Sequence, residues 1–367
     1  MDLTISKEVL GNGIQIVQNA ITQKSSLPVL SNVLLEADLG KLQLTATDLD
    51  IGICATLPVT VKDKGAITVP ARKFFDIVKS LPDGSEIQLS IKKNNSMTIK
   101  SGKAQFRIIG LPKEEFPQLP KFKDKDSITI EQSLLKEMLN LTDFAVSKDD
   151  TRYVLNGILL ELKGDDMSIV ATDGRRMAAV HKKLPTKTLV DREEIIPTKT
   201  VQEVKRLLED EGEVKIQFSD NQVLFSFSGC FIISRLIEGE FPNYKKVIPE
   251  KSPKEIKVSR EDFLSAARRA SIFTDQDSLA IKLDIQKTKM TISKNTPYLG
   301  EAKEQLDINY SGNDAVQIGF NPRYLIDVLK NFPGTEITFE VNDATKPGVI
   351  RRGEEYTYVV LPMQLAA

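Results

Sequence analysis

The sequence contains no tryptophan, a single histidine and only two cysteines among its 367 residues. His181, Cys54 and Cys230 cannot supply the several nitrogen and sulfur ligands that zinc or non-haem iron sites require. The cysteines stand far apart and neither has a CxxC partner, so we expect small buried apolar side chains rather than redox groups. No metal and no other cofactor is predicted.

Long apolar runs and an excess of positive charge are also missing. No uncharged apolar run approaches the roughly 20 residues of a membrane-spanning helix, and the opening MDLTISKEVL lacks the features of a secretion signal. We therefore expect a cytoplasmic protein without membrane contact. Lys and Arg total 50 against 51 for Asp and Glu. Any contact with nucleic acid must then be local or depend on geometry.

Sequence motifs of common active sites are absent as well. Neither GxxxxGK[ST] nor a strand-borne GxGxxG occurs, and the segment LGNG at 10–13 lies inside a helical pattern. A Ser-His-Asp or Cys-His arrangement would need His181, which is better explained as a surface residue at the end of a strand. Asp48 with Asp50, and Asp149 with Asp150, could bind a metal, but turn carboxylates explain them more simply. The chain is not expected to be an enzyme.

What the sequence does have is a threefold internal repeat. The pattern of VPARKFFDIVKSLPDGSEIQLSI at 69–91 returns in outline at 196–219 and at 320–341. Each copy is a short helix after proline, then a turn, then an alternating strand. A second helix opens each copy, and the period of about 125 residues suits a domain rather than a solenoid unit.

The repeat predicts an α+β fold of three similar domains, each with two helices packed on roughly eight antiparallel strands. Proline and lysine interrupt the pattern in LPKFKDKDS and in VIPEKSPKE. We therefore predict domains at 1–126, 127–253 and 254–367.

The helices of the repeat combine an apolar stripe with a basic face. In 72–81, Phe74 and Val78 oppose Arg72, and in 260–273 an alanine-rich stripe opposes Arg268 and Arg269. Solvent exposure alone explains Lys and Arg on any one helix. Repetition in every domain favours a common basic layer, with acidic residues gathered elsewhere.

The repeats resemble the beta subunit of bacterial DNA polymerase III, the sliding clamp, from end to end. The matching landmarks are LPVLSNVLLEA, TATDLDIGI, VPARKFFDIVKSLP, TRYVLNGILLEL, ATDGRRMA, EGEFPNY, INYSG, FNPRYLIDVL and the terminal VVLPMQL. The resemblance implies two three-domain chains closed head to tail into a ring around duplex DNA, with helices lining the hole. It implies a DNA polymerase processivity factor that needs an ATP-dependent clamp loader to open it.

The resemblance also assigns residues to three surfaces. It places on or near the sequence-independent DNA path Lys24, Arg72, Lys73, Lys148, Arg152, Tyr153, Lys199, Arg268 and Arg323. It assigns to a cleft for short linear peptides of the replicative polymerase, the loader and repair proteins Leu155, Thr172, Gly174, Arg175, Arg176, Met177, Pro242, Val247, Asn321, Tyr324, Val360, Leu361, Pro362, Met363 and Leu365. It assigns to the homodimer interface Phe75, Val78, Phe106 and Ile108 against Ile272, Phe273, Glu301 and Glu304, with Lys103 and Arg107 able to pair with the glutamates.

Some alternatives stay open at this point. The residues alone favour a final core strand for VVLPMQL, whereas the resemblance favours an exposed methionine-containing edge of the cleft. The runner-up function is an enzyme acting on nucleic acid through Asp48, Asp50 or Asp173. A third possibility is an accessory clamp-like DNA-binding protein.

Overall fold

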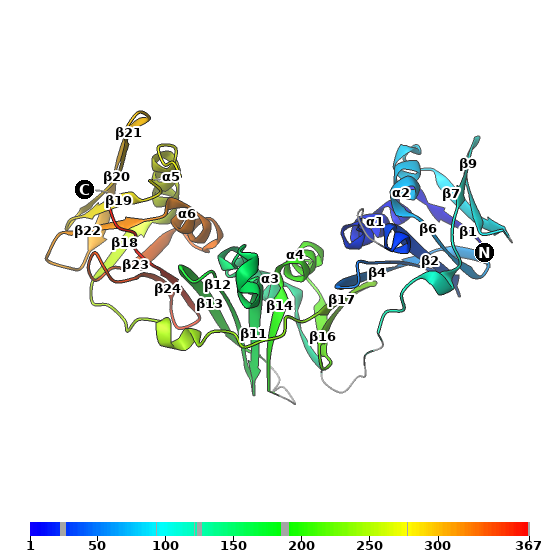
Figure 1. The fold of residues 1–367 in the computed structure, drawn as a ribbon, viewed down its shortest axis with the longest axis horizontal. Helices are drawn as coiled ribbons and strands as arrows, with labels where there is room; N and C mark the ends of the chain where they lie inside the picture. The colour runs from blue at the N-terminus through cyan, green and yellow to red at the C-terminus, as the bar shows by residue number, and fades with distance from the viewer. Residues whose placement is uncertain are drawn as a thin grey trace. The chain divides into compact units, whose positions relative to one another are not determined.

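The structure is a computed structural model that describes residues 1–22, 27–92, 94–120, 122, 127–184, 191–276 and 278–365. Its elements follow nearly the same order three times, with one additional short strand in the first third (Figure 1). The first third contains β1 (Asp2–Ser6), α1 (Lys7–Val17), β2 (Asn32–Asp38), β3 (Lys41–Thr47), β4 (Ile51–Pro58), β5 (Thr60–Asp63), β6 (Gly65–Pro70), α2 (Ala71–Ser80), β7 (Glu86–Lys92), β8 (Ser96–Ser101) and β9 (Ala104–Ile109).

The second third contains β10 (Ser127–Glu131), α3 (Gln132–Asn140), β11 (Gly157–Lys163), β12 (Asp166–Thr172), β13 (Arg176–Lys183), β14 (Arg192–Pro197), α4 (Thr198–Leu207), β15 (Glu213–Phe218), β16 (Gln222–Phe227) and β17 (Cys230–Arg235). The last contains β18 (Glu255–Ser259), α5 (Arg260–Ser271), β19 (Ile281–Ile285), β20 (Lys289–Thr296), β21 (Gly300–Tyr310), β22 (Val316–Phe320), α6 (Pro322–Asn331), β23 (Glu336–Glu340), β24 (Gly348–Arg352) and β25 (Tyr356–Val360). Each third thus has the two predicted helices.

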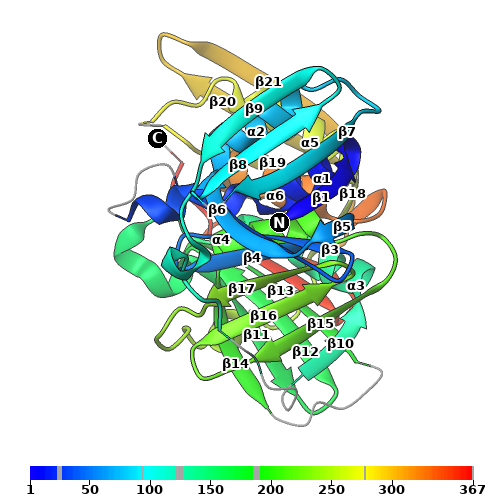
Figure 2. The same cartoon turned by 90° about the vertical axis from the view of Figure 1, so that its right-hand side faces the viewer.

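The chain forms two compact units, residues 1–134 with 202–236 and residues 135–201 with 237–367. The first unit holds an eight-stranded sheet, β10-β15-β16-β17-β4-β3-β2-β6, and a five-stranded sheet, β5-β1-β7-β8-β9. Figure 2 shows β7, β8 and β9 side by side in the smaller sheet. In the larger sheet β17 pairs antiparallel with β4, so strands of two repeats share one sheet.

The second unit is built on one twelve-stranded sheet, β14-β11-β12-β13-β25-β24-β23-β18-β21-β20-β19-β22. Pairing of β13 with β25 joins the second repeat to the third, with Met177 opposite Val359. Helix α5 packs on β18 to β21 and against α6 (Figure 1). Every strand pair among the described residues is antiparallel, which confirms the predicted α+β class.

The helical stripes predicted from periodicity are confirmed. Phe74 and Val78 are buried in α2 while Arg72 is exposed. In α5 the alanine stripe is buried, and Arg268 and Arg269 are exposed. The segment LGNG lies within α1, where a Cβ on Gly13 would come within 2.5 Å of a Leu57 methyl carbon. A larger residue at this position would require the Leu57 side chain to shift.

The two thiols are structural. Cys54 lies opposite Phe231 and Cys230 opposite Ala55 on the paired strands β4 and β17, so the two side chains point to opposite faces of the sheet. Cys54 is buried, but Cys230 is only half-buried, which corrects the expectation of two buried side chains. Burial raises the pKa of both thiols to about 11, which makes them poor nucleophiles.

Among the described residues, no helix combines the length and apolar character that a bilayer crossing requires.

Candidate functional site

The predicted cleft residues all belong to the second unit, and they come from five segments. These are the 3₁₀ segment Asp150–Leu155, the turn between β12 and β13 with the strand ends beside it, the linker after β17, the start of α6, and the end of β25 with the chain that follows. The linker contributes Pro242 and Val247, both exposed. Segments distant in sequence are therefore needed to complete the cleft.

The turn between β12 and β13 is fixed by its own side chains. Thr172 Oγ1 donates to the carbonyl oxygen of Arg176 at 2.7 Å, and Asp173 Oδ1 accepts from the backbone N–H groups of Arg175 and Arg176. Gly174 has φ +81°, a backbone conformation that favours glycine. The turn leaves Arg175 exposed while directing Arg176 inward.

Arg176 is held from several sides. Its Nε donates to Asp173 at 3.0 Å, its Nη1 to Asp327 at 2.7 Å and its Nη2 to the carbonyl oxygen of Phe144 at 2.6 Å. The guanidinium also stacks over Tyr324, 4.5 Å from the ring centroid. The Arg176 guanidinium thus joins the turn between β12 and β13 to α6 and to the segment at Phe144.

The C-terminal segment resolves the two interpretations of VVLPMQL. Strand β25 ends at Val360, which is fully buried, so the first part is a core strand and Val360 does not line an open cleft as predicted. Beyond it the chain leaves the sheet: Leu361 N–H donates to Arg175 O, and Met363 N–H donates to Gly319 O at 2.8 Å. Leu361 and Leu365 are exposed.

Three more of the predicted cleft residues lie in the protein interior. Leu155 and Met177 are buried in one apolar cluster with Leu159, Ile195, Phe241, Tyr244 and others. Asn321 is also buried, and its side chain accepts from Arg323 N–H at the start of α6. Their side chains therefore have little surface with which to contact a peptide.

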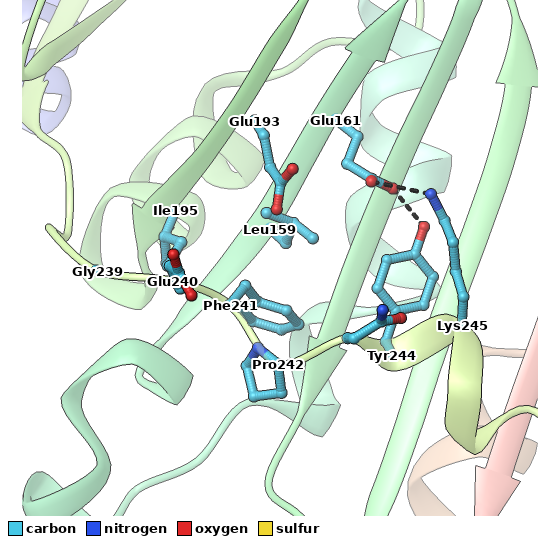
Figure 3. Close-up of a pocket in the computed structure, with 11 residues that line it drawn as sticks. Leu159, Glu161, Glu193, Ile195, Gly239, Glu240, Phe241, Pro242, Tyr244 and Lys245 are labelled. Atoms are coloured by element: carbon cyan, nitrogen blue, oxygen red, sulfur yellow. Dashed lines mark hydrogen bonds and ion pairs between the residues drawn. The ribbon is translucent and has the colours of Figure 1, made fainter.

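A linker contact was not predicted from the sequence. Tyr244 donates its hydroxyl hydrogen to Glu161 Oε2, and Lys245 Nζ donates to the other carboxylate oxygen at 3.2 Å (Figure 3). Tyr244 is buried, and this burial together with Glu161 raises the pKa of its phenol. No local sequence signal points to this pair, because 83 residues separate its members.

The residues predicted to face DNA are exposed wherever the structure describes them. This holds for Arg72, Lys73, Lys148, Arg152, Tyr153, Lys199, Arg268 and Arg323. Lys24 lies outside the described residues. Arg152 is already engaged, because its Nε donates to Asp149 at 3.2 Å and its Nη1 to Asp173 O at 2.9 Å. Its charge is therefore less available to phosphate than that of Arg268.

The predicted interface residues divide into two groups. Ile272 is 72% exposed, and Phe75, Phe106, Phe273 and Glu301 also retain accessible surface. Val78 is only 2% exposed and Ile108 8%, so both side chains belong mainly to the core of their own domain, which corrects their assignment as interface contacts. Glu304 accepts two hydrogen bonds of 2.8 Å from Arg269 of the same chain, which competes with pairing to Lys103 or Arg107.

Two of the three carboxylates of the alternative enzyme hypothesis, those of Asp48 and Asp173, serve as turn acceptors. Asp48 accepts from the backbone N–H groups of Asp50 and Ile51, and Asp173 is used as described above. No group of three or more His, Cys, Asp or Glu side chains within the described residues could hold a metal ion. The turn interpretation of Asp48 is therefore confirmed.

His181 does not form a hydrolytic triad in the described structure. Its Nδ1 lies 2.7 Å from Ser168 Oγ on the neighbouring strand, and burial lowers the pKa of the imidazole. Glu161 pairs with Ser168 across β11 and β12, on the side of Ser168 away from His181. A triad needs its carboxylate on the histidine instead.

Models of one family match the chain in domain order. The DNA polymerase III beta subunit N-terminal domain matches residues 1–120, its central domain 129–243 and its C-terminal domain 245–364. The chain is 31% identical over 365 residues to the beta sliding clamp of Chlamydia muridarum, covering 100% of this chain and 99% of that protein.

Solved structures agree with this match. The DNA polymerase sliding clamp from Bacillus subtilis has a TM-score of 0.95 at 31% identity, and a sliding clamp from Bartonella birtlesii bound to griselimycin has a TM-score of 0.94 at 36% identity. Both alignments cover 100% of each chain. The chain therefore belongs to the DNA polymerase III beta subunit family, the bacterial sliding clamps.

Proposed function

We propose that this chain is a DNA polymerase processivity factor that works as a homodimeric ring. Two copies close head to tail around duplex DNA, and the ring slides while it tethers the replicative polymerase. The observation that carries the proposal is the match of all three family domains, in order, along one chain. The role is non-enzymatic, in keeping with the family, and we place it in the cytoplasm.

The division of the chain follows the repeat, with clamp domains at 1–126, 127–253 and 254–367. The larger sheets support this arrangement, because β17 with β4 and β13 with β25 tie the second repeat to both others by backbone hydrogen bonds. Because these sheets continue from one repeat into the next, backbone hydrogen bonds between strands hold neighbouring domains together.

The exposed cations on the helices and turns are the proposed DNA path. Enclosure holds the duplex without tight adhesion, so weak contacts to phosphate suffice and strong ones would hinder sliding. The near-equal totals of 50 basic and 51 acidic residues are compatible with this mode of binding.

The five-segment cleft is the proposed docking site for short linear peptides of the polymerase, the clamp loader and repair proteins. Exposed Leu361 and Leu365, with Met363 between them, provide adaptable apolar surface for several peptides. Apolar Ile272 and Phe273 of one copy would meet Phe75 and Phe106 of the other at ring closure.

Primer extension tests this function. With the loader and polymerase of the same host, the chain is expected to lengthen the product made in one polymerase binding event. In solution its mass should be twice 40.9 kDa. A monomer that leaves product length unchanged would contradict the proposal.

The DNA path makes a separate prediction for Arg268. Its replacement by alanine removes one exposed cation on α5. We expect modestly weaker DNA binding and a slope of log K against log salt reduced by about one unit. Arg152→Ala is the matched comparison and should have the smaller effect, because Arg152 is engaged by Asp149. The slopes are measured by salt titration of DNA binding. Equal slopes for wild type and Arg268→Ala would show that Arg268 does not contact the DNA phosphates.

A further inference from the structure

The backbone of the linker that forms one wall of the proposed cleft is hydrogen-bonded to the rest of the protein near its two ends. Among the described residues, Ile237 N–H donates to Ile195 O at 2.9 Å at one end of the linker, and the side-chain Nη2 of Arg351 donates to Pro249 O at 2.8 Å at the other. Between these points the chain carries the exposed cleft residues Pro242 and Val247. Their position must therefore depend on side-chain contacts of the linker.

Packing between the linker and the neighbouring strands is incomplete. A cavity of about 550 Å³ opens between linker residues 239–245 and the strands β11 and β14. Figure 3 shows Glu193 and Leu159 on the strand side of this cavity and Phe241 and Pro242 on the linker side. A wall beside an open cavity has room to shift when its contacts weaken.

Tyr244 occupies the middle of this wall and is held at both ends of its side chain. Its ring is buried in the apolar cluster with Leu155 and Met177. Its hydroxyl donates to Glu161, which also accepts from Lys245 Nζ at 3.2 Å. Glu161 belongs to β11, which is hydrogen-bonded to β12 on one side and to β14 on the other. The backbone that carries the acceptor is therefore fixed within the sheet.

We propose that the Tyr244–Glu161 hydrogen bond is a latch that sets the position of the linker wall for peptide binding. Tyr244 and Glu161 are positioning residues, since they act through Pro242 and Val247. The inference rests on the proposed function of the cleft. It assigns part of the peptide affinity to two residues outside the cleft residues predicted from the sequence.

Griselimycin is a suitable probe, because a solved relative contains it. Its affinity for the full-length chain is measured by calorimetry at 25 °C, and thermal unfolding is followed in parallel. Tyr244→Phe keeps the ring and removes the hydroxyl. We expect its griselimycin affinity to fall about three- to tenfold, the effect of one hydrogen bond, while the chain stays folded at 25 °C. The methyl NMR signals of Val247 should shift in the same variant without ligand.

Further variants separate positioning from general destabilisation. Glu161→Leu should weaken binding at least as much as Tyr244→Phe, because it also removes the acceptor of Lys245. The double variant should be no weaker than Glu161→Leu alone, because the Tyr244 bond is already lost in that variant. Glu161→Gln keeps an acceptor oxygen and should restore most of the affinity. Lys246→Met, an exposed neighbour, is the control and should bind like wild type.

The outcomes distinguish the latch from the cleft itself. Wild-type affinity in Tyr244→Phe, or losses that add in the double variant, would overturn the latch and leave the proposed function standing. If the wild-type chain binds neither griselimycin nor polymerase, the proposed peptide-binding cleft is wrong, and the latch proposal fails with it.

Discussion

Removal of residues 363–367 is expected to abolish polymerase stimulation while leaving the ring assembled. The truncation takes away Met363 and Leu365, which edge the cleft, together with the hydrogen bond from Met363 N–H to Gly319 O. It spares β25, which ends at Val360 and supplies the core pairing with β13. Stability should therefore change little, whereas the apolar surface for peptides is lost.

Two measurements check this truncation. Primer extension with the host polymerase should show no gain over polymerase alone, and the solution mass should remain that of a dimer. Leu39→Ala provides a control, since Leu39 is a 90% exposed apolar residue in the first unit, far in sequence from the tail. Stimulation that survives the truncation would show that the cleft has been placed wrongly.

Replacement of Arg176 by alanine is expected to cause the largest loss of any single substitution in the cleft. The change leaves Asp173, Asp327 and the Phe144 carbonyl without their guanidinium partner and removes the stack on Tyr324. Breaking a fully buried ion pair costs about 3–5 kcal/mol. Because the Asp327 side chain is 39% exposed, we expect a loss of about 2–3 kcal/mol here.

Arg176→Lys is the matched variant for this prediction. Lysine keeps the charge but cannot reproduce the planar fork or the stacking, so it should recover only part of the stability and of the peptide affinity. Urea unfolding and griselimycin binding measure the two effects. If Arg176→Ala unfolds like wild type and binds normally, the guanidinium does not organise the cleft.

The architecture could be predicted from the sequence because its signals are local and repeated. Apolar spacing identified the buried stripe of α2, which includes Phe74, and proline marked the start of α6 at Pro322. The basic faces followed from the same spacing, and Arg268 is exposed as expected. Each of these inferences depends on neighbours within a few turns of chain.

The details of the candidate site depend on contacts between distant segments. Val360 and Leu361 are adjacent, yet one is buried in a strand and the other is exposed, and no periodicity marks the point where the chain leaves the sheet. Arginine side chains usually lie at the surface, so the sequence does not predict that Arg176 points inward. Its partner there is Asp327, which is 151 positions away in the sequence. Tyr244 and Glu161 meet only after the linker folds back over β11.

Retention on circular DNA tests the central claim most directly. The chain is loaded onto a closed circular duplex by the ATP-dependent loader of its host, free protein is removed, and the circle is then cut once. Enclosure predicts that the chain stays on the intact circle through a wash at high salt and leaves the cut duplex by sliding off its ends. Equal retention on the circular and the linearised DNA would mean that adhesion, rather than enclosure, holds the protein on the duplex.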